Sequence, residues 1–244
     1  MIDKLPRIDN ELELLAQLVP LDDQRIIELG CGSARLMRDL LQAHPGSVGL
    51  ALEVDERQHA KNLAQAQDRL SFAVGGAQAI AQPDARFDLA LMLKSLHHVP
   101  LALMDGALAE VARVLRPGGH LYVSEPVYDG PLNDIVRIYN DEGVVRAAAQ
   151  RAVDAALAPA RGPALWQAAH EVRFMTRMSF RDFADFETRM MRPTFADHGL
   201  DDDQVARVRA AFEPHITPTG ADFVRPMHIR LLRRTAAEAA GVTG

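Results

Sequence analysis

The stretch Ile26–Gly32, IIELGCG, decides the fold that the sequence predicts. Residues 25–29 form a short apolar run, which is typical of a buried β-strand. Gly30 and Gly32 follow, and glycine is needed where the backbone turns sharply and approaches a ligand closely. A helix predicted over 33–44 then offers free N–H groups and partial positive charge at its first turn. The stretch therefore predicts a strand–turn–helix unit that binds a dinucleotide pyrophosphate or an amino-acid carboxylate.

The glycine pattern of this turn is incomplete. No glycine stands at Ser33, Ala34 or Arg35, so the GxGxxG pattern of dinucleotide-binding turns is not formed. A lone GxG also occurs in tight turns that bind nothing, and that alternative stays open. The turn favours binding of a cofactor but does not identify which cofactor binds.

A carboxylate follows at the expected distance. Glu53 ends a predicted strand over 47–53, 21 residues after Gly32, and can accept hydrogen bonds from both hydroxyls of a ribose. Asp55 lies on the same face of an extended segment, so the spacing alone does not choose between the two. Either carboxylate could also serve only as an acidic residue at the start of the helix predicted over 56–69. We favour Glu53 because the strand ends there.

Strands and helices alternate through the first half of the chain. Further strands are predicted at 70–75, 87–93 and 120–125, and further helices at 10–18 and 101–115. Five strands alternating with helices indicate a parallel, doubly wound sheet with right-handed crossovers. The alternation then stops, with helices predicted at 132–157, 179–192 and 201–213 and a last strand at 227–232.

Composition and charge restrict the class of protein. The 244 residues carry a formal charge of −6, which disfavours sequence-independent binding of nucleic acid. The single Cys31 excludes an intrachain disulfide and favours a reducing cytoplasm. The first ten residues contain no apolar signal core, and LALML at 89–93 is too short to cross a bilayer. We expect a cytoplasmic protein with no membrane partner, and a homodimer is compatible with the sequence.

Four segments together resemble class I S-adenosylmethionine-dependent methyltransferases, most closely the small-molecule branch that includes the ubiquinone/menaquinone biosynthesis enzymes. The segments are IIELGCG at 26–32, LALEVDE at 50–56, FDLALMLKSLHHV at 87–99 and EVARVLRPGGHLYVSE at 110–125. Each is modest by itself, but their order and spacing are specific. They cover the chain from 26 to 125.

The resemblance implies a fold and a division of the chain. The fold is α/β, with a Rossmann-like, doubly wound, mostly parallel sheet of about seven strands whose last strand is antiparallel. A helical insertion or cap follows the fifth strand. We expect one methyltransferase domain over 1–244, with a cofactor-binding core at about 20–126, an acceptor-side cap at about 127–215 and a final strand at about 226–234.

The resemblance also implies that S-adenosylmethionine is the cofactor and assigns residues to it. One group would hold the methionine part, namely Glu28, Gly30, Cys31 and Gly32. Glu53 would bind the ribose and Val54 would pack on the adenine, with Gly76, Ala77 and Gln78 at the adenine edge. Lys94 would meet the cofactor carboxylate or an anionic acceptor, and His97 would line the pocket. The family often has an acid where Gly76 stands and a glycine where Ala34 stands; Gln78 or a backbone carbonyl can replace the acid.

The catalytic candidates are His98, Glu125 and Tyr128. His98 follows the fourth predicted strand, and an unperturbed histidine suits proton transfer near neutral pH. Glu125 and Tyr128 follow the fifth strand and could orient an acceptor hydroxyl or amine, although both also suit ordinary strand-end positions. The segment 223–227, FVRPM, could close the pocket from the other side. No metal site is predicted.

We therefore expect direct SN2 transfer of a methyl group to a small-molecule acceptor, with the protein aligning the reactants and excluding water. The rivals are a non-catalytic, regulatory S-adenosylmethionine-binding protein of the same fold, a nicotinamide-dependent oxidoreductase and an RNA methyltransferase. The incomplete glycine pattern disfavours the oxidoreductase, and the acidic balance disfavours the RNA enzyme. Lys94–His97 replaces the Asn/Asp-Pro-Pro-aromatic segment of enzymes that methylate amino groups of nucleic acid.

Overall fold

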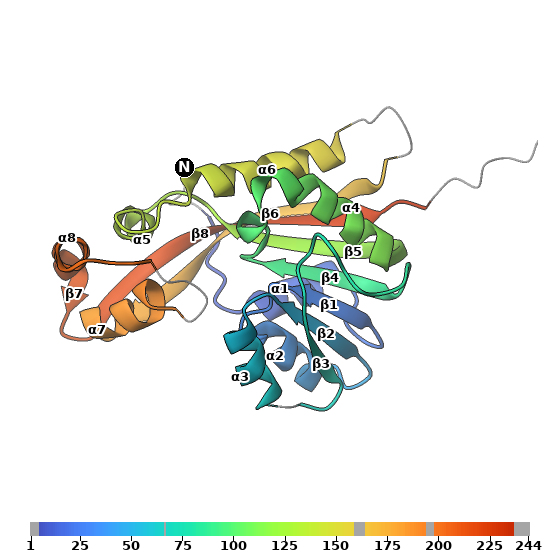
Figure 1. The fold of residues 1–244 in the computed structure, drawn as a ribbon, viewed down its shortest axis with the longest axis horizontal. Helices are drawn as coiled ribbons and strands as arrows, with labels where there is room; N and C mark the ends of the chain where they lie inside the picture. Colours follow the sequence, from blue (N-terminus) through green and yellow to red (C-terminus); the bar gives the residue numbers. More distant parts are fainter. Residues whose placement is uncertain (1–4, 66, 159–163, 194–197, 237–244) are drawn as a thin grey trace, which may run out of the picture.

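One mixed sheet organises the chain (Figure 1). The computed structural model describes residues 5–65, 67–158, 164–193 and 198–236. The strand order is β3–β2–β1–β4–β5–β8–β6, with the short β7 paired to β8, which makes eight strands. The parallel part contains β1 (Arg25–Leu29), β2 (Val48–Glu53), β3 (Leu70–Val74), β4 (Phe87–Leu93) and β5 (Leu115–Pro126). The antiparallel part adds β6 (Trp166–Phe180), β7 (Ile216–Thr217) and β8 (Gly220–Arg234), with β8 paired to both β5 and β6.

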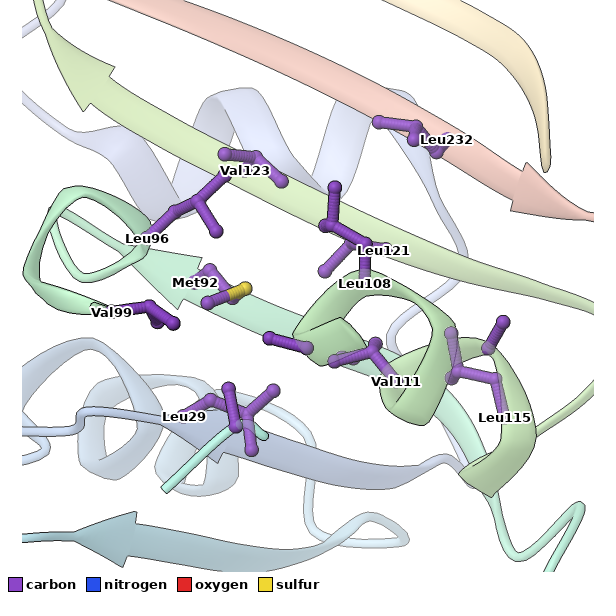
Figure 2. Close-up of a cluster of buried hydrophobic side chains, with 14 of the residues drawn as sticks. Leu29, Met92, Leu96, Val99, Leu108, Val111, Leu115, Leu121, Val123 and Leu232 are labelled. Carbon is purple, nitrogen blue, oxygen red and sulfur yellow. The ribbon is translucent and has the colours of Figure 1, made fainter. Parts of the chain in front are cut away.

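Helices cover both faces of this sheet. One face carries α1 (Glu11–Leu18), α2 (Arg35–Ala43) and α3 (Glu56–Leu63), and the other carries α4 (Met104–Val114) and α6 (Gly143–Leu157) (Figure 1). Each face has its own core of buried apolar side chains. Figure 2 shows the core under α4, where Leu108 and Val111 lie against Met92 of β4 and Leu121 of β5. The predicted doubly wound α/β fold is therefore confirmed.

The far ends of β6 and β8 leave the main sheet and form a separate lobe (Figure 1). Its helices are α5 (Pro131–Val136), α7 (Phe183–Phe186) and α8 (Asp202–Phe212), and a π-helical turn spans Glu187–Met191. Aromatic rings fill its core, with Phe180, Phe186 and Phe212 in mutual contact at centroid distances of 4.9–6.1 Å. We call this unit the outer lobe.

The insertion after β5 differs from the predicted helical cap. Residues 166–180 form the strand β6, because they pair with β8 along its length. The helix predicted over 132–157 is divided into α5 and α6, and the one predicted over 56–69 ends at Leu63. Strand β6 lies at the edge of the sheet, and its first half after Trp166 is exposed and lacks apolar alternation. Its second half does alternate, with Val172, Phe174, Met178 and Phe180 on one face, and this signal was missed.

Among the described residues, no helix is both long and apolar enough to span a membrane.

The core under α4 supports the strands that carry the cavity described below. Leu121 is fully buried there, so Leu121→Ala should lower the free energy of unfolding by about 2–5 kcal/mol, as methylene removal and a residual cavity do in other cores. Urea unfolding followed by circular dichroism measures the change. Val144→Ala, at a side chain that is 69% exposed, is the matched control and should change stability by less than about 0.5 kcal/mol. Equal losses in the two variants would contradict this description of the core.

Candidate functional site

A cavity of about 1300 Å³ lies at the carboxyl ends of the parallel strands. The loops after β1, β2, β3, β4 and β5 all contribute to it, and the strand order reverses between β1 and β4. Open α/β sheets bind ligands at such a reversal. All the residues predicted to bind the cofactor line this cavity: Glu28, Gly30, Cys31, Gly32, Glu53, Val54, Gly76, Ala77, Gln78, Lys94 and His97. Its volume exceeds that of a usual single-ligand pocket, so there is room for two molecules.

The turn after β1 is shaped by left-handed backbone. Gly30 and Gly32 have φ angles of 67° and 52°, and Ala34 has 53°, which explains why the family often has glycine there. A Cβ at Gly30 would lie 2.8 Å from the Cβ of Ser95, so glycine is required by packing against the next loop. At Gly32, by contrast, a Cβ would meet nothing within 4 Å. Packing within the protein therefore requires glycine at position 30 but not at position 32.

The Glu53 carboxylate ties two loops together. Its Oε2 accepts from the N–H of Gly32 at 2.7 Å, and its Oε1 accepts from the N–H groups of Val54 and Asp55 at 2.8 and 3.0 Å. The rival Asp55 instead caps α3, because its carboxylate accepts from the N–H of Arg57 at 3.0 Å. The helix-start role thus falls to Asp55, and Glu53 holds the turn that carries Gly32.

Glu28 is a buried carboxylate with an oxygen that has no hydrogen-bond partner. Its side chain is at the end of β1, and Oε2 is the unpartnered atom. The pKa of Glu28 is raised to about 8, mainly because of burial; Lys94 opposes the rise, and the carboxylates of Glu53 and Glu11 add to it. A buried acceptor without a donor costs free energy, so the site fits a ligand that brings a donor, such as the ammonium group of an amino acid.

The Glu28 pKa predicts a pH-dependent stability. Between the ordinary pKa of 4.5 and the folded value of about 8, the folded state holds a proton that the unfolded state has lost. The free energy of unfolding should therefore fall as pH rises through this window, by up to about 1.4 kcal/mol per pH unit. Glu28→Gln should remove this slope and stabilise the ligand-free protein at pH 8. Urea unfolding from pH 6 to pH 9 measures it, with the exposed Glu56→Gln as control; an unchanged slope in Glu28→Gln would refute the assignment.

The loop after β3 lacks the acid that the family often has. A Cβ at Gly76 would lie 2.5 Å from Oε1 of Gln78, so the Gln78 amide occupies the space beside this glycine. Both residues and the exposed Val54 lie on the cavity wall. The Gln78 amide is thus placed where the missing carboxylate would act.

Two histidines follow β4. The buried Glu125 carboxylate accepts from the N–H of Leu96 at 3.0 Å and from Nδ1–H of His97. The rings of His97 and His98 lie 4.1 Å apart, and both residues line the cavity. Partial burial and the neighbouring His97 lower the pKa of His98, so it is neutral at pH 7 and able to accept a proton.

A second carboxylate, that of Glu142 directly before α6, lies beside this group. Oε2 of Glu142 lies 3.8 Å from Nε2 of His97, and Arg146 donates to the same oxygen at 2.6 Å. Ligand atoms of His97, His98 and Glu142 lie within 4.8 Å of one another, which is close enough for a cation. Arg146 already neutralises Glu142, so the group is better suited to moving a proton than to holding a metal.

Two of the three catalytic candidates need correction. Glu125 is only 1% exposed and does not line the cavity, so it acts through His97 and cannot touch an acceptor. Tyr128 also lies outside the cavity lining, and its hydroxyl donates to Asp141 at 2.8 Å. The prediction failed for Tyr128 because the chain turns away from the cavity after Val127. His98 keeps its place on the cavity wall.

Several residues of the site were not predicted from the sequence. Glu142 directly precedes α6 and Arg146 lies on it, and the sequence of this element shows only an Ala-rich helix. Asn62 of α3 donates to the carbonyl of Gly32 at 2.7 Å and so braces the turn after β1. Arg225 of β8 lies in the segment 223–227, for which only a closing role was expected. Spacing along the chain carries no signal for such long-range contacts.

A comparison with protein families finds a match for the first half of the chain. Residues 27–123 match the family model described as a methyltransferase domain. This match supports the resemblance of the sequence to class I S-adenosylmethionine-dependent methyltransferases. The match covers the loops that carry Glu28, Glu53 and His98, and it ends before α5. The outer lobe lies outside it.

Curated relatives match about half of the chain. The 27-O-demethylrifamycin SV methyltransferase of Amycolatopsis mediterranei is 32% identical over 116 residues, which are 46% of this chain and 42% of that protein. The fatty-acid O-methyltransferase of Mycolicibacterium smegmatis is 35% identical over 139 residues, which are 53% and 48%. The chain thus spans about half the length of the curated relatives it matches.

Solved structures share the fold over nearly the whole chain. The YcgJ protein of Bacillus subtilis has a TM-score of 0.62 at 15% identity, and the match covers 93% of this chain and 98% of that one. The cyclase SpnF has a TM-score of 0.59 at 20% identity, with 93% and 80% covered. At these identities the likeness concerns the fold.

Proposed function

We propose that the protein transfers a methyl group from S-adenosylmethionine to a hydroxyl group of a small molecule. The observation that carries the proposal is one cavity whose wall joins the loops of the methyltransferase domain to the neutral His98. The curated relatives named above are O-methyltransferases, which supports an oxygen acceptor. One structural neighbour is a cyclase, so the fold alone does not decide the chemistry.

The cofactor would be held by the residues at the carboxyl edge of the sheet. Oε2 of Glu28 would accept from the ammonium of the methionine part, and Lys94 would meet its carboxylate. Glu53 has one free lone-pair position beside its three backbone hydrogen bonds and would accept from the ribose. Val54 and Gln78 would contact the adenine. When bound, S-adenosylmethionine would supply a methyl group that is activated by the sulfonium, with the neutral thioether S-adenosylhomocysteine as the leaving group.

His98 would accept the proton of the acceptor hydroxyl. It needs no prior deprotonation at pH 7, because its pKa is lowered. His97 lies against it and is fixed by Glu125, so Glu125 and His97 position the base. Since the activation resides in the cofactor, the remaining work of the protein is alignment and exclusion of water.

Removing the base should slow the reaction without releasing the cofactor. His98→Asn should lower kcat by about 10²–10⁴-fold, the usual contribution of a general base. The acid limb of the wild-type kcat profile should lie below pH 6.5, because protonated His98 is inactive and its pKa is lowered. Glu125→Gln should move that limb to still lower pH, since the Glu125 charge raises the pKa of His98. His44→Asn is the control; a wild-type profile without an acid limb would exclude His98 as the base.

Glu53 should matter for cofactor affinity. Glu53→Ala should weaken binding of S-adenosylmethionine by about 1–3 kcal/mol, because ribose hydroxyls and the N–H of Gly32 lose their acceptor. Asp55→Ala, which removes a carboxylate two residues away and uncaps α3, is the matched control and should bind nearly as the wild type does. Calorimetric titration measures both. Unchanged affinity in Glu53→Ala would remove the ribose assignment.

The acceptor can be found directly. Purified protein is incubated with a metabolite extract and S-adenosylmethionine labelled in the methyl group, and labelled products are identified by mass. We expect a small labelled O-methyl product that His98→Asn forms much more slowly. Cofactor binding without any labelled product would favour the non-catalytic alternative, and label in added RNA would favour the RNA alternative. The cytoplasm is the proposed location, supported by the buried free thiol of Cys31.

A further inference from the structure

Arg225 differs from the other arginines on the acceptor side of the cavity. Arg146 pairs with Glu142 at 2.6 Å, Arg177 with Asp222 at 2.6 Å and Arg189 with Asp185 at 3.1 Å. The Arg225 side chain forms no hydrogen bond or ion pair with any residue in the described part of the chain, and its Nε is buried. It is therefore a cation without a direct partner in the cavity wall.

Such a group is costly to the empty protein. A guanidinium has five N–H donors and remains charged at neutral pH, so poor solvation without a partner destabilises the fold. Burial and the positive charge of Arg146 lower the pKa of Arg225, and the carboxylates of Glu11 and Glu142 only partly oppose this. A destabilising side chain directed at a cavity is typical of a binding residue.

Charged and apolar groups both surround Arg225. The charged ones are Arg146, Glu142 and Glu11. Met227 lies two residues along β8, on the same face, and pairs across the sheet with Pro126 at the end of β5. Leu132 and Val136 of α5 and Met190 of the π-helical turn also line the cavity. A cation without a direct partner, in a wall that also presents these apolar side chains, matches a largely apolar molecule that carries one negative charge.

We propose that Arg225 binds the carboxylate of the acceptor, which makes the acceptor an apolar monocarboxylic acid with a hydroxyl group. This inference rests on the proposed function and names its substrate class. Arginine pairs with carboxylate through two parallel hydrogen bonds. A phosphate is disfavoured because Arg146 and Arg177 each pair with a carboxylate of their own, and Arg189 pairs with Asp185, which it shares with Arg181; only Arg225 has no carboxylate partner among these cavity arginines.

Binding of matched acid and amide probes tests the charge. We would titrate 3-hydroxybenzoate against 3-hydroxybenzamide, and octanoate against octanamide, each with and without saturating S-adenosylhomocysteine. At least one acid should bind roughly 10- to 100-fold more tightly than its amide, the usual effect of a hydrogen-bonded charge. Equal affinity of acid and amide in both pairs, or preferential binding of inorganic phosphate, would overturn the proposal.

Variants assign the preference to Arg225. Arg225→Gln should abolish the preference for the acid, and Arg225→Lys should keep part of it. Arg177→Gln, at an exposed arginine on the same wall, should keep it in full. Arg225→Gln should also raise the melting temperature of the ligand-free protein, by roughly 2–4 °C. A preference that survives Arg225→Gln, or a lowered melting temperature in that variant, would overturn the proposal.

Cofactor binding separates this inference from the proposed function. Arg225→Gln should bind S-adenosylmethionine as the wild type does, and a loss of that affinity would show that Arg225 serves the cofactor instead. If the wild type binds the acid probes through Arg225 but fails to bind S-adenosylmethionine, the proposed function fails and the anion site stands. If it binds the cofactor but shows no preference for acids, the anion site fails alone.

Discussion

The rest of the site depends on the hydrogen bonds of the Glu53 carboxylate. Glu53 ends β2, yet it accepts from the N–H of Gly32 in the turn after β1 and from two N–H groups of its own loop. Hydrogen bonds to a charged acceptor stabilise by about 1.5–3 kcal/mol each, which is enough to fix one loop relative to the other. The parallel register of β1 and β2 brings the two loops to the same edge of the sheet. The turn that would face the cofactor is therefore placed by the residue that would bind the ribose.

The cavity concentrates features that destabilise the empty protein. Glu28 and Arg225 each bury a polar atom without a partner, and Lys94 holds a left-handed backbone at φ 57°. Costs of this kind persist only where the surrounding structure over-determines them, and they cluster at functional sites. The two apolar cores on either face of the sheet offset them. The unpartnered groups are an acid at the end of β1 and a guanidinium on β8, and this difference indicates two ligands with different chemistry.

Local sequence patterns predicted the parallel half of the sheet and the residues at the ends of its strands. The buried strands β1 to β5 are short apolar runs, and the residues at their carboxyl ends meet at one edge because parallel strands must. The residues proposed to bind the cofactor, including Glu28 and Glu53, were predicted from that rule and from the family resemblance. Most residues proposed to face the acceptor were not predicted. Strand β6 lies at an edge and its first half is polar, and Glu142 and Arg225 reach one cavity from elements that are far apart in the sequence. Glu125 was predicted to orient the acceptor because its position at the end of a strand is known from the sequence, whereas the direction of its carboxylate toward His97 is not.

The central claim is that the loops tied by Glu53 form a site for S-adenosylmethionine. Calorimetric titration of the protein with S-adenosylmethionine and, separately, with a nicotinamide dinucleotide tests it most directly, since the incomplete glycine pattern distinguishes the two cofactors. The account predicts saturable binding of one S-adenosylmethionine per chain and no measurable binding of the dinucleotide. Absence of S-adenosylmethionine binding, or equal binding of the dinucleotide, would contradict it.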